Sequence, residues 1–96
     1  MYRAPTPPTT NPRNQVTIDL MILAYDAAKI VGNVPHKHAL GNAMKALRHT
    51  PIYIDTLEKA SEVKWLTSEA TGRFCVEATQ GLRPAWLISL EEEVAR

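Results

Sequence analysis

The stretch VTIDLMILAYDAAKIVGNVPHKHALGNAMKALRH, residues 16–49, decides the expected fold because its apolar residues recur at helical spacing in two segments. The first segment carries a regular apolar face made of Leu20, Met21, Ala24, Ala27, Ala28 and Val31. Gly32 and Asn33 follow, and both residue types readily adopt the left-handed conformation that ends helices. The sequence therefore predicts a helix from Val16 to Val31.

This first predicted helix is apolar over more than one face. Its polar stripe is narrow and contains Asp19, Asp26 and Lys29, whereas the remaining outer positions are Ile18, Ile22, Leu23, Tyr25 and Ile30. A single neighbouring layer does not cover so wide an apolar surface. We therefore expect the helix either to be central to the fold or to join two subunits, and we predict a homodimer formed through its apolar surface.

The second segment predicts an amphipathic helix of about Pro35 to His49, since proline is well tolerated in the first helical turn. Its core-facing stripe has the spacing i, i+3, i+4, i+7 and consists of Leu40, Ala43, Met44 and Leu47. The opposite side is polar and basic: it carries His38, Asn42, Lys45 and His49 and is flanked by Lys37 and Arg48. One face of this helix is thus expected to be cationic.

After Thr50 the pattern favours strands. Short β-rich or alternating runs are Ile52–Ile54, Val63–Trp65, Phe74–Ala78 and Ala85–Leu90, with turns expected at Glu69–Gly72 and Gln80–Pro84. The spacing from Leu57 to Ser61 also allows a short helix that reaches Trp65, and this alternative stays open. The expected fold class is α+β, with two N-terminal helices followed by a small antiparallel β-sheet. That order is compatible with a reduced winged-helix-like arrangement.

Length and composition limit the number of domains and the cellular compartment that we expect. The 96 residues are sufficient for one domain, which we place at residues 16–96 after a disordered Pro/Thr-rich tail at residues 1–15. Arg3 and Arg13 would make this tail a basic arm if it met a polyanion. The single cysteine, Cys75, excludes an internal disulfide, and no stretch resembles a membrane span or a secretory signal. We therefore expect a cytoplasmic protein with no membrane contact.

A charge block suggests the partner. No acidic residue occurs from Ala27 to Ile54, whereas four cations and all three histidines lie there, and the formal net charge of the chain is only +1. We expect a regulatory protein that binds DNA through the second helix. The candidate contacts are Lys37, His38, Asn42, Lys45 and Arg48, with Arg73 near the tip of a hairpin wing.

The helix-turn-helix pattern is met only in part. Ala28 and Gly32 have the expected offset between a packed alanine and a turn glycine, but the later apolar positions of the motif coincide with Pro35, His38 and Gly41. A turn about two residues longer would restore the register. The spacing alone therefore does not establish this motif.

Catalytic and metal chemistry are poorly supported. His36, His38, His49 and Cys75 lack the spacing of a zinc site, and Cys75 lacks the accompanying groups of a catalytic thiol, although a strand would leave it partly exposed. We expect no enzyme, no metal and no cofactor.

The rival hypothesis is a stoichiometric protein-binding inhibitor or adaptor, of the kind that mobile elements encode. The aromatic residues that would anchor such an interface are Tyr25, Tyr53, Trp65 and Trp86. In a domain with so few aromatic residues, however, the two tryptophans are expected more often in the core.

Overall fold

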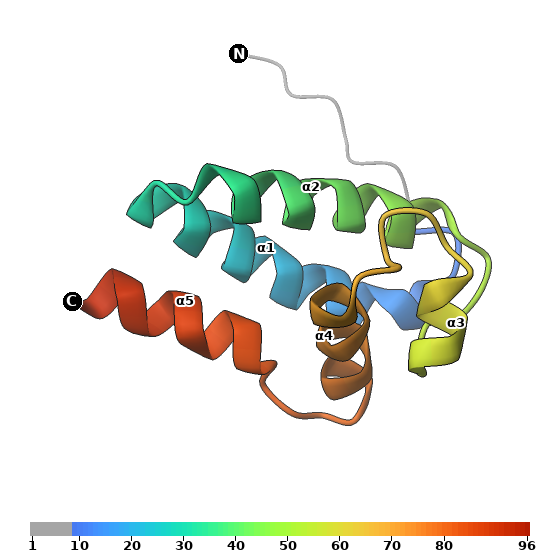
Figure 1. Cartoon of the computed structure of the whole chain (residues 1–96). Helices are drawn as coiled ribbons and strands as arrows, with labels where there is room; N and C mark the ends of the chain where they lie inside the picture. The colour runs from blue at the N-terminus through green and yellow to red at the C-terminus, as the bar shows by residue number, and fades with distance from the viewer. Residues whose placement is uncertain (1–8) are drawn as a thin grey trace, which may run out of the picture.

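The computed structural model describes residues 9–96, and this part of the chain is helical (Figure 1). A short 3-10 helix, η1 (Pro12–Asn14), precedes five α-helices: α1 (Gln15–Val31), α2 (Val34–His49), α3 (Leu57–Ser61), α4 (Glu69–Thr79) and α5 (Ala85–Ala95). Within residues 9–96 there is no strand, so the predicted α+β fold class and the winged-helix-like arrangement are wrong. None of the described helices has both the length and the apolar character needed to cross a membrane.

Both predicted N-terminal helices are confirmed to within a residue at each end. The φ angle of Gly32 is 75°, so the glycine ends α1 in the left-handed conformation, where residues with a Cβ are strained. Asn33 then caps α2, because its side-chain oxygen accepts a hydrogen bond from the backbone N–H of His36. Gly32 therefore ends α1, and Asn33, the next residue, begins α2.

Helix α1 is the central element of the fold. It lies between α2 and α5, and α4 also packs against it (Figure 1). The face that meets these helices is fully buried and includes Ile18, Met21, Ala24 and Ala28. The small alanines leave room for close helix packing on two sides. Because three helices pack against α1, a large part of its wide apolar surface is buried.

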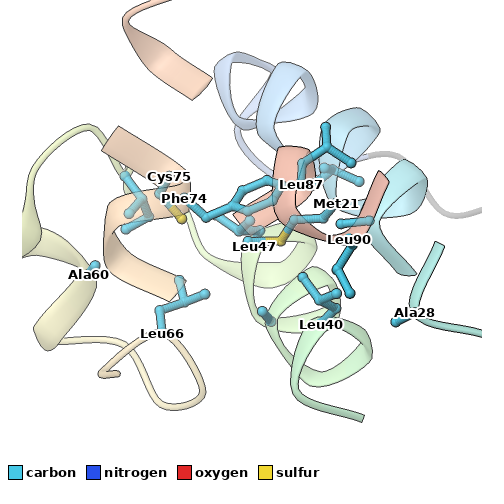
Figure 2. Close-up of a cluster of buried hydrophobic side chains, with 14 of the residues drawn as sticks. Met21, Ala28, Leu40, Leu47, Ala60, Leu66, Phe74, Cys75, Leu87 and Leu90 are labelled. Carbon is cyan, nitrogen blue, oxygen red and sulfur yellow. The ribbon is translucent and has the colours of Figure 1, made fainter. Parts of the chain in front are cut away.

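The hydrophobic core forms where α1, α2, α4 and α5 meet. In Figure 2, the side chains of Met21, Leu47, Phe74, Leu87 and Leu90 converge from these four helices. All five are buried to 1% exposure or less. A second part of the same cluster joins α3 and α4 through Ala60, Leu66 and Cys75, as Figure 2 also shows.

The segment predicted as a strand at residues 52–54 is held by a side chain instead of a neighbouring strand. The amide of Asn14, which is fully buried, donates from Nδ2 to the carbonyl oxygen of Ile52 over 2.8 Å. Its Oδ1 accepts from the backbone N–H of Ile54 over 3.0 Å. One asparagine thus satisfies the two backbone groups that a neighbouring strand would otherwise pair.

The strand expected at Val63–Trp65 is also absent. Helix α3 occupies Leu57–Ser61, so the open alternative of a short helix is correct for these residues, but a turn comes after it and the helix does not reach Trp65. Thr56 starts α3 by accepting a hydrogen bond from the N–H of Lys59. Trp65 has a positive φ of 75°, which is incompatible with the extended strand backbone that was expected.

The two remaining predicted strands are α4 and α5. The residues expected to form a turn at Glu69–Gly72 are the first turn of α4, which Ser68 caps. Thr71, Phe74, Cys75 and Ala78 are buried at the spacing i, i+3, i+4, i+7, so helical periodicity underlies the apparent alternation. The turn at residues 80–84 does connect the two elements, but it leads into the helix α5 and not into a strand.

The predicted disordered tail at residues 1–15 falls partly outside the described residues, as does Arg3 of its proposed arm. From Thr9 onward the chain packs against the domain: the N–H of Thr10 donates to the carbonyl of Arg48 over 2.8 Å. The Arg13 guanidinium lies over the Tyr53 ring, 4.0 Å from its centroid. Residues 9–15 thus belong to the packed part of the chain.

The hydrogen bonds of Asn14 predict a large effect on stability. In Asn14→Ala, the buried N–H of Ile54 and the part-buried carbonyl of Ile52 lose their partner, so we expect the free energy of unfolding to fall by about 2–4 kcal/mol. Asn11→Ala is the matched control, because Asn11 also makes two side-chain hydrogen bonds, one to the carbonyl of Pro51 and one from the N–H of Arg13, and both are exposed. It should cost less than about 1 kcal/mol. Urea denaturation measures both, and equal losses would contradict the assignment.

Candidate functional site

The predicted basic face of α2 is present and exposed. Lys37, Lys45 and Arg48 are separated by eight and three residues, so helical geometry places them within about 80° of one another around the axis. Lys45 is opposite the buried Leu40 and Leu47, whereas Lys37 and Arg48 flank the buried side. From Lys37 to Arg48 the helix rises by about 17 Å. His38 and Lys45 are exposed, whereas Lys37 and Arg48 are half-buried. The charges thus form a row along the outer surface of α2.

Four of the six predicted contact residues share one hollow. It has a volume of about 350 Å³ and is lined by Tyr25, Lys37, His38, Gly41, Asn42 and Lys45. The Tyr25 ring comes from α1, and a Cβ added to Gly41 would lie 3.5 Å from that ring. Because Gly41 has no side chain, the tyrosine ring forms part of the hollow. The site is therefore a shallow cationic depression with an aromatic wall.

No acidic side chain neutralises these cations within residues 9–96. The ion pairs in this part of the chain are Lys59 with Asp55, Arg73 with Glu69, and Arg83 with Glu91. All three involve α3, α4 or α5 and their flanking residues. The positive charge along α2 is therefore uncompensated by contacts, as an anion-binding surface requires.

Arg73 does not belong to this site. It was expected at the tip of a hairpin wing, but it lies in α4, where its Nε is 3.3 Å from a carboxylate oxygen of Glu69 one turn earlier. The hollow that it lines contains Leu57, Val76, Glu77 and Ala85 and no residue of α2. The predicted role of Arg73 therefore rested on a hairpin that the described chain does not form.

The helix-turn-helix geometry is absent as well. Figure 1 shows α1 and α2 running side by side in opposite directions, joined by Gly32 and Asn33 alone. A helix-turn-helix unit instead crosses its two helices at about 90–120° and joins them by a turn of three or four residues. The pair is an αα-hairpin, so any contact through α2 uses the side of the helix that faces away from α1 and the core.

A second hollow borders α2 on its other flank and was missed from the sequence. Its volume is about 400 Å³, and its lining residues are Ala39, Asn42, Lys64, Trp65, Thr67, Ser68 and Thr71. Asn42 lines both hollows, so the two depressions adjoin. Trp65 was expected in the core but is 53% exposed. The helix caps Thr56 and Ser68 were the one sequence signal that Lys64 and Trp65 lie in a loop.

The histidines do not gather into a metal site. Among the described residues there is no group of three or more histidine, cysteine and acidic side chains that could hold a metal ion. His36 instead connects α2 to α5: its Nδ1 is 3.3 Å from the indole Nε1 of Trp86, and the two rings meet edge to face at 5.2 Å. Its contacts thus lie within the fold.

Cys75 has no exposed strand position, because it is buried in α4 with 0% exposure. Burial raises the pKa of its thiol from an ordinary value of 9.0 to about 12, since the apolar surroundings disfavour the charged thiolate. A catalytic cysteine requires the opposite shift. At neutral pH the side chain is a protonated, apolar part of the core.

Comparison of the chain with protein-family models, with curated proteins and with solved structures gave no match. Charge, exposure and local geometry are therefore the features of this chain that bear on its function. Helical folds of this size serve unrelated purposes, so the fold by itself does not indicate a function.

The burial of the Cys75 thiol predicts how the free energy of unfolding changes with pH. Because the pKa of Cys75 is higher in the folded state, its contribution to stability is complete below about pH 9 and is lost as the pH rises toward 12. The free energy of unfolding should fall less steeply over this range in Cys75→Ala than in the unchanged protein. Denaturation at a series of pH values measures this, and parallel curves would contradict the burial argument.

Proposed function

We propose that this protein is a small, non-catalytic regulatory protein that binds DNA through the exposed face of α2. The observation that carries the proposal is the row formed by Lys37, Lys45 and Arg48, which has no acidic partner within the described chain. His38 and Asn42, which lie beside this row, add side chains that can contact base edges. The single buried thiol is in keeping with a reducing cytoplasm.

The dimensions of α2 support a groove-bound helix. Its 16 residues correspond to a rod about 24 Å long, and the major groove of B-DNA, about 12 Å wide, admits an α-helix. The lysine and arginine side chains are long enough to reach phosphates at the groove edges from a helix in this position. Recognition would then combine phosphate contacts that position α2 with base contacts from its shorter polar residues.

Charge reversal on α2 tests the proposal. Lys45→Glu and Arg48→Glu should each weaken binding to a DNA duplex by about tenfold or more, because each removes a charge-assisted phosphate contact. With about three phosphates contacted, the logarithm of the binding constant should fall with the logarithm of salt concentration at a slope near −3, and each variant should reduce that slope by about one. Fluorescence anisotropy of a labelled duplex measures both quantities.

Arg73→Glu is the matched control, because it makes the same charge change on α4 outside the hollow of α2. It should leave duplex affinity within about twofold, and thermal unfolding should show that all three variants remain folded. Equal losses in Arg73→Glu and Lys45→Glu would point to net charge alone and remove α2 as the binding element. Unchanged affinity in both α2 variants would have the same consequence.

A second observation favours a protein partner. Val16, Leu23 and Ile30 are spaced by seven residues, lie on one side of α1, and are 57%, 47% and 70% exposed. Exposed apolar residues in a row of this kind are typical of protein interfaces. In the DNA-binding proposal this stripe joins two copies of the chain; in the alternative, a protein-binding inhibitor or adaptor uses it to occupy a different protein.

Light scattering after size exclusion distinguishes these roles. If α1 joins two copies, the unchanged protein should have twice the mass of one chain, and Leu23→Glu should be a folded monomer, because a buried unpaired carboxylate opposes association. Leu57→Glu on α3, where Leu57 is 48% exposed, is the control and should leave the mass unchanged. A monomeric unchanged protein that retains one protein partner through nuclease and high salt would favour the inhibitor or adaptor.

A further inference from the structure

The hollow around Trp65 combines an exposed aromatic ring, a cation and hydrogen-bonding groups. The ammonium of Lys64 lies over the indole, 5.1 Å from the ring centroid, while more than half of the Trp65 surface remains accessible. Asn42 and Thr67 contribute an amide and a hydroxyl to the same hollow. An aromatic plane with nearby polar side chains is the arrangement that binds unstacked nucleobases in single-stranded nucleic acids.

The exposed side chain of Trp65 is accompanied by an unusual backbone conformation. Its φ of 75° lies in the left-handed region, and among the described residues Trp65 is the only non-glycine with a positive φ. This conformation is unfavourable for a bulky residue, and it persists where the surrounding structure enforces it. The chain turns sharply between the buried residues Ala60 and Leu66, so the indole is directed away from the core.

The place of the hollow favours a nucleic acid over a neutral ligand. Asn42 belongs to both hollows, so the ring of Trp65 adjoins the cationic depression that contains Lys37 and Lys45. Lys64 adds a further positive charge, and none of the described residues that line the hollow is acidic. Ser68 and Thr71 bond to one another over 2.8 Å, which leaves Asn42 and Thr67 for a ligand.

We propose that the hollow formed by Trp65, Lys64, Asn42 and Thr67 binds an unpaired nucleobase of a strand whose phosphates contact the basic face of α2. The base stacks on the indole, and Asn42 and Thr67 donate or accept hydrogen bonds at its polar edge. This inference rests on the proposed function for the backbone contacts, and it adds that the preferred ligand contains single-stranded nucleotides.

The test compares a single-stranded oligothymidylate of about twelve nucleotides, a duplex of equal length and a poly-glutamate peptide. Trp65→Gly removes the ring while permitting the positive φ, so the loop should keep its shape. It should weaken binding of the single strand by about tenfold and leave duplex binding within about twofold. Trp65→Phe, which retains a ring for stacking, is the control and should lose less than about threefold. The single strand should also quench tryptophan emission in the unchanged protein.

The outcomes separate this inference from the proposed function. Duplex binding that depends on Lys45, together with unchanged single-strand affinity in Trp65→Gly, overturns the base site alone. Loss of single-strand binding in Trp65→Gly with no detectable duplex binding supports the base site and removes the groove-bound helix. Poly-glutamate that binds as tightly as the single strand and with the same dependence on Trp65 overturns the base site and assigns the hollow to acidic protein segments.

Discussion

The burial of α1 between α2 and α5 is the constraint on which the rest of the structure depends. Ile18, Met21, Ala24 and Ala28 are without solvent exposure, and α1 packs against α2, α4 and α5. Burial of these side chains provides a large part of the hydrophobic free energy available to so short a chain. The alanines also let the backbones of adjacent helices approach closely. Helices α2, α4 and α5 pack directly on α1, and α3 packs on α4.

This packing explains why the charged face of α2 is outward. Helix α2 contributes Leu40, Ala43 and Leu47 to the core, and the opposite side of an α-helix is then necessarily directed to solvent. Because α1 and α2 are antiparallel and joined by two residues, the exposed side runs along the whole of α2 (Figure 1). The candidate surface is thus a direct consequence of the hairpin and of the absence of acidic residues between Ala27 and Ile54.

Sequence periodicity identified α1 and α2 well because both are long and strongly patterned, and Gly32 and Asn33 mark their boundary. It was misleading in the second half, where the elements are short. Phe74, Val76 and Ala78 alternate as in a strand, yet Phe74 and Ala78 are also one helical turn apart, so the two periods cannot be separated over so few residues. The burial of Thr71 and the N-cap at Ser68 fit helix α4 and not a strand.

The sequence by itself determined the first two helices, their boundary and the basic character of α2, because these properties depend on neighbours within a few residues. It also identified Lys37, His38, Asn42 and Lys45 as one group, since helical geometry relates them directly. Only the tertiary structure separated Arg73 from them, buried Asn14 against residues 52–54, and placed Trp65 beside Asn42. The burial of Asn14 and the place of Trp65 depend on contacts between segments far apart in the chain, which local periodicity does not encode. The place of Arg73 depends on whether a short segment with an ambiguous pattern forms a helix or a strand, which packing decides.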